Sequence, residues 1–435
     1  MPHALTDLPV RTVVRDRPVA AADPAEHAVS ADVCVVGAGI SGLSAAVESA
    51  KLGRDVVLVD ALPVLGGQMV NSLIGLFCGV FGNAPEHRRL THGIFDDIFA
   101  ALEPTGDIFH RVGHTTTVGY DEVRLGRWVE DTVRAHGIRV LTGAAIVGVE
   151  RDGRRIVSVR FATRYGPVEV AAGGFVDASG DAALAWSAGL ECRLPEREIY
   201  GSQQLVVENL DENHRPDPGE LAERVGAKAA EYGLTRHDGL AFFFPGRGTA
   251  VLNMTHIEAP LDPFAAAAAQ IEGKVQADRV VTFLRTEFPE VFGKATVRSY
   301  GLPGRRQTRW VRAVHQLTVD EVRAGVRFPD AVARTAWPIE LHDSPEGYVW
   351  ETFGPDHVHY VPLRSMTPPD ADNLIAAGRC VDGDAAALSS VRVMGPCAAM
   401  GHAAAHAFDL AGAGSVHDVS YPALTARIRE NVRDD

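Results

Sequence analysis

The feature that most constrains the fold is a glycine-rich turn between an apolar run and a run with helical spacing. The sequence GAGISG (residues 37–42) follows the apolar run 32–36 and opens the small-residue segment 41–53. A second β-branched run, 55–60, then ends in Asp60. Glycines at these places let a diphosphate approach a helix N-terminus, and an acidic side chain after the next strand can bind ribose hydroxyls. The sequence therefore predicts a parallel βαβ unit that binds a dinucleotide.

Three further segments favour FAD over NAD, since both cofactors use this unit. The segment LGGQ (65–68) follows Asp60 closely, where a second backbone approach to an extended dinucleotide is expected. The segment VDASGD (176–181) ends a strand-like run in small residues. The segment AAGRCVDGD (376–384) precedes a small-residue helix near the C-terminus, from where it can reach the ribityl chain and the isoalloxazine ring.

The remaining pattern predicts a dinucleotide domain made from both ends of the chain. Residues 120–137 have the pattern of a capped helix, and turn signals divide 138–180 into a β-meander and a return strand. Long helices are expected at 219–232 and 263–287. We therefore expect an α/β fold, in which a Rossmann-like, three-layer FAD-binding domain with a parallel sheet and a β-meander carries an inserted α+β substrate domain. The predicted boundaries are 1–30 for an N-terminal extension, 31–190 and 365–435 for the discontinuous FAD-binding domain, and 191–364 for the substrate domain.

Composition excludes several other classes of protein. With 42 basic and 56 acidic residues the chain has a net charge of −14, which disfavours nucleic acid and anionic membrane surfaces as partners. Its five cysteines form no C-x-x-C pair, so neither a disulfide framework nor a zinc site is indicated. No apolar run approaches the length of a membrane span, and residues 1–31 lack the apolar core of a signal peptide. We expect a cytoplasmic protein.

These motifs resemble those of the FAD-dependent oxidoreductase family, within the wider glutathione-reductase-like flavoprotein superfamily. The similar segments lie between residues 32 and 410, and the most specific are DVCVVGAGISGLSAA at the start and SSVRVMGPCAAMGHAAA at the end. The resemblance implies a non-covalent FAD, with the pyrimidine edge of the flavin near 392–397. Together with the glycine turn, it predicts these FAD-contacting residues: Gly37, Ala38, Gly39, Ser41, Gly42, Asp60, Ala61, Gly66, Gly67, Gln68, Ile146, Ser179, Gly180, Gly378, Arg379, Asp384, Arg392, Gly395 and Cys397.

Arginines in the middle of the chain are the candidates for substrate binding. A guanidinium group can bind a carboxylate through two hydrogen bonds, which makes Arg306, Arg309 and Arg364 suitable anchors, with Arg305 beside them. Tyr360 is a further candidate. Structural ion pairs are the alternative for each arginine.

The candidate catalytic bases are His357 and His359. They alternate in HVHYVPLR, so both would face one side of a strand, where one could accept a proton while a hydride passes to the flavin. A hydrogen-bonded structural pair is the alternative. No metal site is predicted, and His402 and His406, four residues apart on the last helix, are assigned to packing or capping.

Three functions remain open at this point. The first is a dehydrogenase or oxidase that takes a hydride to flavin N5 from a small, carboxylated amine or hydroxy substrate, with oxygen or another molecule as electron acceptor. The second is a flavin reductase or monooxygenase that uses NAD(P)H, although no second glycine fingerprint is present. The third is a non-catalytic flavin-binding subunit of a complex. A homo-oligomer is compatible with each of them.

Overall fold

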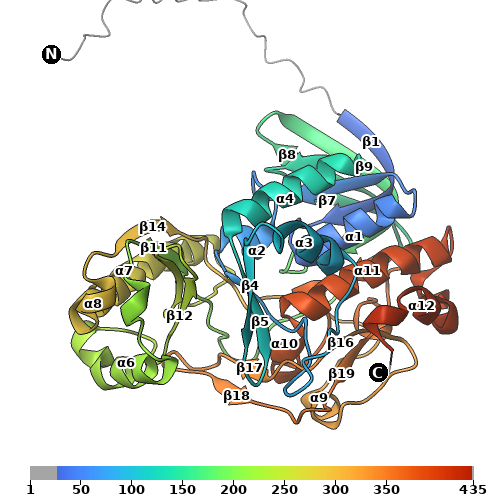
Figure 1. Cartoon of the computed structure of the whole chain (residues 1–435). Coiled ribbons are helices and arrows are strands. Elements are labelled where there is room, and N and C mark those ends of the chain that lie inside the picture. Colours follow the sequence, from blue (N-terminus) through green and yellow to red (C-terminus); the bar gives the residue numbers. More distant parts are fainter. Residues whose placement is uncertain (1–26, 434–435) are drawn as a thin grey trace, which may run out of the picture.

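The computed structural model describes residues 27–433 and divides them into two lobes (Figure 1). The larger lobe contains both ends of the described chain, and the smaller one is formed by the middle of the chain, drawn in green and yellow. The two-part arrangement agrees with a cofactor domain interrupted by an insertion. Residues 1–26, which hold most of the predicted N-terminal extension, lie outside the described residues; residues 27–30 already belong to the first strand.

The main sheet of the larger lobe has seven strands in the order β6-β2-β1-β9-β8-β7, and β20 also pairs with β9. Its central pairs are parallel, while β7, β8 and β9 form the antiparallel meander. The strands are β1 (His27–Val36), β2 (Val56–Asp60), β6 (Arg139–Thr142), β7 (Ala145–Asp152), β8 (Arg155–Thr163), β9 (Gly166–Asp177) and β20 (Leu374–Ala376).

Helices cover one face of this sheet, and the meander and a short helix cover the other. Along β1, Val33 and Val35 point into the core beneath the long helices, whereas Cys34 and Val36 point into the opposite core. This two-residue alternation is why the parallel strands are apolar throughout. The helices of this lobe are α1 (Ile40–Lys51), α2 (Gly67–Asn71), α3 (Ile94–Leu102), α4 (Glu122–Ala135), α5 (Ala183–Ser187), α9 (Val319–Ala324), α10 (Ala385–Val391), α11 (Met394–Ala411) and α12 (Tyr421–Arg427).

The smaller lobe is a four-stranded antiparallel sheet backed by helices, with a hydrophobic core of its own. The two long helices predicted from the sequence are confirmed as α6 and α7, and Asp217 and Asp262 cap their N-termini. The elements are β11 (Leu205–Glu208), β12 (Leu240–Phe244), β13 (Thr249–Asn253), β14 (Thr296–Tyr300), α6 (Pro218–Tyr232), α7 (Pro263–Glu287) and α8 (Pro289–Phe292).

The smaller lobe ends earlier than the predicted insertion of 191–364. Val332, Tyr360 and Leu363 pack into the core beneath α1 and α11 rather than into the core of the second sheet. The segment after Tyr300 therefore belongs by packing to the larger lobe. The strands outside the two main sheets are β3 (Leu76–Phe77), β4 (Ile108–Val112), β5 (Thr116–Tyr120), β10 (Cys192–Arg193), β15 (Trp310–Val311), β16 (Ala331–Thr335), β17 (Ile339–Leu341), β18 (Val349–Glu351) and β19 (His359–Pro362).

No helix within residues 27–433 is long and apolar enough to cross a membrane. The expectation of a cytoplasmic location stays a prediction.

Candidate functional site

A cavity of about 860 Å³ extends from the glycine turn of the larger lobe to the sheet of the smaller lobe. Gly37 and Asp60 line one end, and Phe242 and Asn253, from the second sheet, line the other. Both lobes therefore build one continuous site. The cavity is lined by these of the predicted cofactor and substrate residues: Gly37, Gly39, Ser41, Asp60, Ala61, Gly67, Gln68, Ser179, Gly180, Arg305, Arg306, Arg379, Arg392 and Cys397.

The glycine turn has the geometry that its sequence predicts. Gly37 has a φ of 107°, and a Cβ there would lie 2.3 Å from the carbonyl oxygen of Ala178. A Cβ at Gly42 would lie 1.8 Å from the carbonyl oxygen of Gly37, so only glycine lets α1 pack this closely. At Gly39 the nearest atom to such a Cβ is 4.0 Å away, and this open space faces the cavity. Strand, turn and helix thus leave a hollow at the N-terminus of α1.

Asp60 fixes the turn and also faces the cavity. One carboxylate oxygen accepts a hydrogen bond from the Ala38 amide at 2.6 Å, and the other accepts one from the Leu62 amide at 2.8 Å. Burial raises the pKa of Asp60, and these two amides oppose that rise. A carboxylate oxygen has two lone pairs, so Asp60 can also accept a ribose hydroxyl on its cavity side.

The opposite wall of this end combines a small-residue turn with an arginine nitrogen that makes no hydrogen bond. Asp177, fully buried, accepts hydrogen bonds from the Ser179 hydroxyl and amide and so holds the turn that leads to Gly180. A Cβ on Gly180 would lie 2.1 Å from Nη2 of Arg379. Nη1 of Arg379 is buried and has no hydrogen-bond partner. Within the described part of the chain this nitrogen has only an ion pair with Asp181 at 3.9 Å, so a guanidinium group with hydrogen bonds to spare faces a glycine-lined hollow, which fits the diphosphate of FAD.

Five predicted FAD contacts support the cavity wall without lining it: Ala38, Gly42, Gly66, Gly378 and Gly395. A Cβ on Gly378 would lie 2.3 Å from the Ser41 hydroxyl, and one on Gly395 would lie 2.1 Å from the carbonyl oxygen of Gly79. The amide of Gly66 donates to the Ala38 carbonyl at 3.0 Å. These residues let neighbouring backbones approach each other, which is a packing role.

Two further predicted FAD contacts do not line the cavity: Ile146, whose backbone the resemblance places near the adenine, and Asp384. Both stay predictions. Ile146 lies on β7, where it packs against the core on the far face of the sheet. Asp384 caps α10 by accepting from the Ala387 amide at 2.8 Å, and it also accepts from the Val319 amide at 2.6 Å. Unlike Asp60, it does not line the cavity, and a strand–loop–helix pattern cannot distinguish helix capping from ligand binding.

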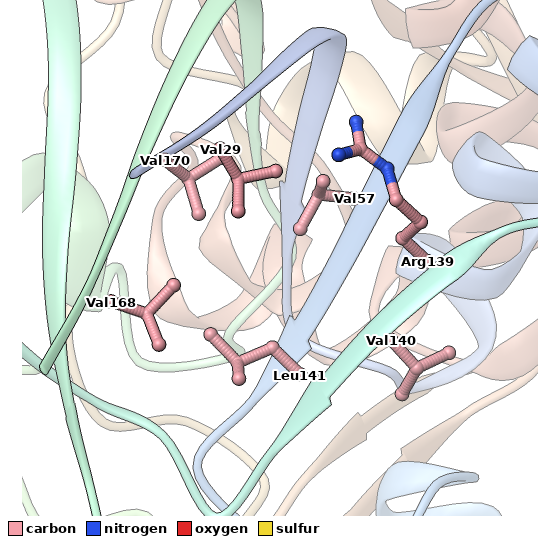
Figure 2. Close-up of a pocket in the computed structure, with 7 residues that line it drawn as sticks. All are labelled: Val29, Val57, Arg139, Val140, Leu141, Val168 and Val170. Atoms are coloured by element: carbon pink, nitrogen blue, oxygen red, sulfur yellow. The ribbon is translucent and has the colours of Figure 1, made fainter. Parts of the chain in front are cut away.

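A smaller pocket of about 130 Å³ lies between the strands of the main sheet (Figure 2). It is lined by Val29, Val57, Arg139, Val140, Leu141, Val168 and Val170. Arg139 is already bonded to the carboxylate of Asp55 and to the Ser30 carbonyl. With no polar groups converging on it from the described residues, this pocket has none of the features of a catalytic site.

The wall of the main cavity also holds a cluster of charged side chains that includes Arg306, Arg392 and Glu340. Arg306 is buried and donates to the Tyr200 carbonyl at 2.6 Å and to the Ser202 hydroxyl at 2.9 Å. Arg392 donates to the backbone carbonyl of Glu340 at 3.0 Å, and its Nε is buried without a hydrogen-bond partner. Burial, with the nearby charge of Arg392, lowers the pKa of Arg306 to about 9.

Glu340 begins a line of hydrogen-bonded groups that leads away from the cavity. Its Oε1 lies 2.9 Å from Nε2 of His342, and Nδ1 of His342 lies 2.9 Å from Nε2 of His256. Nδ1 of His256 in turn donates to the Pro345 carbonyl at 2.9 Å. Oε2 of Glu340 accepts from the Trp337 indole at 3.1 Å. The carboxylate lines the cavity, and both imidazoles are buried behind it.

The number of protons shared by Glu340, His342 and His256 decides whether these groups can take up another. Three contacts in a row need three N–H or O–H protons, but two neutral imidazoles and a carboxylate supply two. Burial and the charge of Arg306 lower the pKa of His342 well below its usual value, and burial lowers that of His256 to about 3. Both imidazoles are therefore neutral near pH 7, and the line has room for one more proton.

The two predicted catalytic histidines do not reach the cavity. His359 is buried, and its Nδ1 lies 3.1 Å from Nε2 of His357 while its Nε2 bonds the Ser390 hydroxyl at 2.8 Å. His357 stacks on Phe353 with ring centroids 4.0 Å apart. Neither imidazole lines the cavity, and the two bond each other, so the structure does not bring the predicted bases to the candidate site.

Three predicted substrate residues also lie outside the cavity wall. Arg364 donates to the buried carboxylate of Asp330 at 3.1 and 3.2 Å, so it is a structural ion pair. Arg309 donates to the Asp181 carbonyl and covers Trp186. Tyr360 packs in the core of the larger lobe. Of the predicted anchors, Arg306 and its neighbour Arg305 line the cavity.

Sequence reasoning missed several cavity residues, of which Glu340 is the most important. Glu340 on β17 and His342 just after it alternate in the same way as His357, just before β19, and His359 at its start, so a signal of the same kind was present. Arg111, on β4, has a buried Nη1 without a hydrogen-bond partner. The other missed residues include Trp337, Tyr348, Trp350, Gln204 and Asn253.

The fold and the cavity together define a flavin-dependent oxidoreductase. The chain belongs to the FAD dependent oxidoreductase family, whose model matches residues 32–428. It is therefore an enzyme with FAD as its cofactor, as the sequence motifs predict.

Individual relatives are more distant. A KsdD-like steroid dehydrogenase of Mycolicibacterium smegmatis is 48% identical over 75 residues, which are 17% of this chain and 13% of that protein. A geranylgeranyl bacteriochlorophyll reductase-like protein from Thermoplasma acidophilum aligns with a TM-score of 0.49 and 14% identity, over 92% of this chain and 83% of its own. A flavin-dependent brominase aligns with a TM-score of 0.47 and 12% identity over the same shares of the two chains.

Proposed function

We propose that the enzyme oxidises a small, carboxylated amine or hydroxy substrate, whose carboxylate is held by Arg306 and Arg392. This reassigns Arg392, which the family resemblance places at the pyrimidine edge of the flavin, to the substrate. One observation supports this most. Two guanidinium groups meet in the wall of the cavity, close enough for Arg392 to lower the pKa of Arg306, and Glu340 is the carboxylate beside both. A substrate carboxylate would supply a further negative charge to two neighbouring cations and a partner to the unpaired Nε of Arg392.

The proton released on oxidation would pass to Glu340. The carboxylate faces the cavity, and the two neutral imidazoles behind it leave the line one proton short of a complete set of hydrogen bonds. Uptake of a proton would complete that set only in passing. Burial raises the pKa of Glu340, but the hydrogen bond with His342 and the charges of Arg392 and Arg306 hold it well below its usual range, so Glu340 would pass the proton on to solvent. His342 and His256 act through Glu340, so they are positioning residues.

FAD would occupy the end of the cavity at the glycine turn. Bound FAD supplies the hydride acceptor. Gly37, Gly39 and Arg379 would hold its diphosphate, and Asp60 its ribose, because these groups offer the open backbone, a guanidinium nitrogen without a hydrogen bond and the carboxylate that those parts require.

The experiment for this proposal is Glu340→Gln, assayed against carboxylated amines and hydroxy acids. We expect kcat to fall by about 10²–10⁴-fold, the usual contribution of a general base, while the FAD content per chain is unchanged. Glu346→Gln is the matched control, since Glu346 is an exposed glutamate on the same segment. A kcat within about threefold of the wild type would place the base elsewhere, since a general base contributes far more than that.

A further inference from the structure

We infer that Glu48, His402 and His406 form a binding site for one divalent transition-metal ion, with Zn²⁺ the best match. The three side chains come from α1 and α11, outside the flavin cavity. Their donor atoms all lie within 4.8 Å of one another, and all three side chains are largely buried.

The spacing of the donor atoms suits a tetrahedral ion. Oε1 of Glu48 lies 3.0 Å from Nε2 of His406, and Oε2 lies 3.5 Å from Nδ1 of His402. Two ligand atoms bound at about 2.1 Å to a tetrahedral zinc are about 3.4 Å apart, so small side-chain movements would suffice. The two histidines are four residues apart on one helix, which places both imidazoles on the same face. The fourth position would be left to water.

The charge balance also favours a cation between these groups. Among the described residues, Glu48 pairs with these two imidazoles and with no lysine or arginine, so no permanent positive charge balances its carboxylate. Lys51 at the end of α1 and Arg54 just after the helix pair instead with Asp97 and Asp409. Nδ1 of His402 is buried and has no hydrogen-bond partner. A buried carboxylate beside two imidazoles, one of which has a ring nitrogen 3.5 Å away without a hydrogen bond, is a donor set that a metal ion would satisfy.

A metal ion here would hold α1 against α11 at the base of the FAD-binding domain. The two helices already touch through their backbones, since a Cβ on Gly401 would lie 2.0 Å from the carbonyl oxygen of Ser41. Helix α1 begins at the glycine turn, and Met394 and Cys397 at the start of α11 line the cavity. An ion bound to the folded chain alone would therefore stabilise the two helices that frame the cofactor.

The test is calorimetric titration of Zn²⁺ into tag-free, FAD-loaded protein that has been treated with a chelator. We expect one equivalent to bind and the melting temperature to rise. His406→Gln and Glu48→Gln should each weaken binding by at least about 100-fold, since each removes one ligand of three. The control is His110→Gln, because His110 pairs with Glu103 at 2.9 Å on the surface and belongs to no cluster of three ligands. No binding to the wild type, or unchanged binding in both variants, overturns the inference.

A spectroscopic measurement decides the case in which a variant loses FAD or fails to fold. X-ray absorption on wild-type protein with one equivalent of Zn²⁺ should show two imidazoles and at least one oxygen ligand at about 2.0–2.2 Å. A thiolate ligand, or any number of imidazoles other than two, would overturn the inference.

Discussion

At the residue scale, the charged cluster in the cavity wall depends on which arginines face the cavity. Arg306 lines the cavity with its guanidinium group partly paired, whereas Arg364 uses both of its side-chain hydrogen bonds on Asp330. The two residues look alike in the sequence, and both are candidate anchors there. Only the tertiary structure separates an arginine that can bind a ligand from one that holds the lobe together.

This difference gives a paired prediction. Arg306→Leu should raise KM for the carboxylated substrate by about 30- to 1,000-fold, because losing a charged hydrogen-bond partner costs about 2–4 kcal/mol. Arg364→Leu should leave KM unchanged but lower the free energy of unfolding, because it strands the buried carboxylate of Asp330. Steady-state kinetics and urea denaturation of both variants provide the measurement. The reverse pattern would restore Arg364 as the anchor.

At the element scale, the parts of the fold set by local chemistry could be predicted from the sequence. The βαβ unit, the meander and the long helices α6 and α7 were all visible, because glycine turns, capping aspartates and apolar periodicity act within a few residues. The partners of Glu340 and His359 could not be predicted in this way. Both lie in alternating patterns, and which face of a strand meets the cavity is decided by elements far away in the chain.

Two glycines on helices test whether close packing of the backbone requires glycine. Gly42→Ala should abolish FAD retention, because the new Cβ would lie 1.8 Å from the carbonyl oxygen of Gly37. Gly226→Ala, in the middle of α6, makes the same chemical change where the nearest atom is 3.5 Å away. It should stabilise the protein by about 0.5–1 kcal/mol through helix propensity. Visible absorbance and thermal melting measure both effects, and an FAD-bound Gly42→Ala would refute the packing argument.

At the scale of the whole molecule, buried histidines make stability depend on pH. Burial lowers the pKa of His256 and His359 to about 3, and that of His342 falls well below its usual value. Below pH 6.5 these histidines bind protons in the unfolded chain but stay neutral in the folded chain. The free energy of unfolding therefore falls as the pH drops from about 6.5 towards 3.

We expect each of these histidines to cost about 2 kcal/mol of stability between pH 7 and pH 5. The measurement is urea denaturation at both pH values, and His359→Gln should reduce the dependence. A pH-independent unfolding free energy would mean that these imidazoles are protonated in the folded protein.

The arrangement of the two lobes places the charged cluster and the cofactor residues in the wall of one cavity. The larger lobe provides the glycine turn, Asp60 and Arg379, while residues of both lobes enclose Arg306, Arg392 and Glu340. The central claim is that this one cavity joins FAD to a substrate bound through its carboxylate.

The most direct test is anaerobic mixing of the FAD-loaded enzyme with 2-amino and 2-hydroxy acids and with their amides, while the visible flavin band is followed. We expect at least one free acid to bleach the flavin band with one equivalent per FAD. The matching amide, which lacks the carboxylate, should leave the band unchanged. Bleaching by NAD(P)H with none of the acids, or equal bleaching by acid and amide, would contradict the central claim.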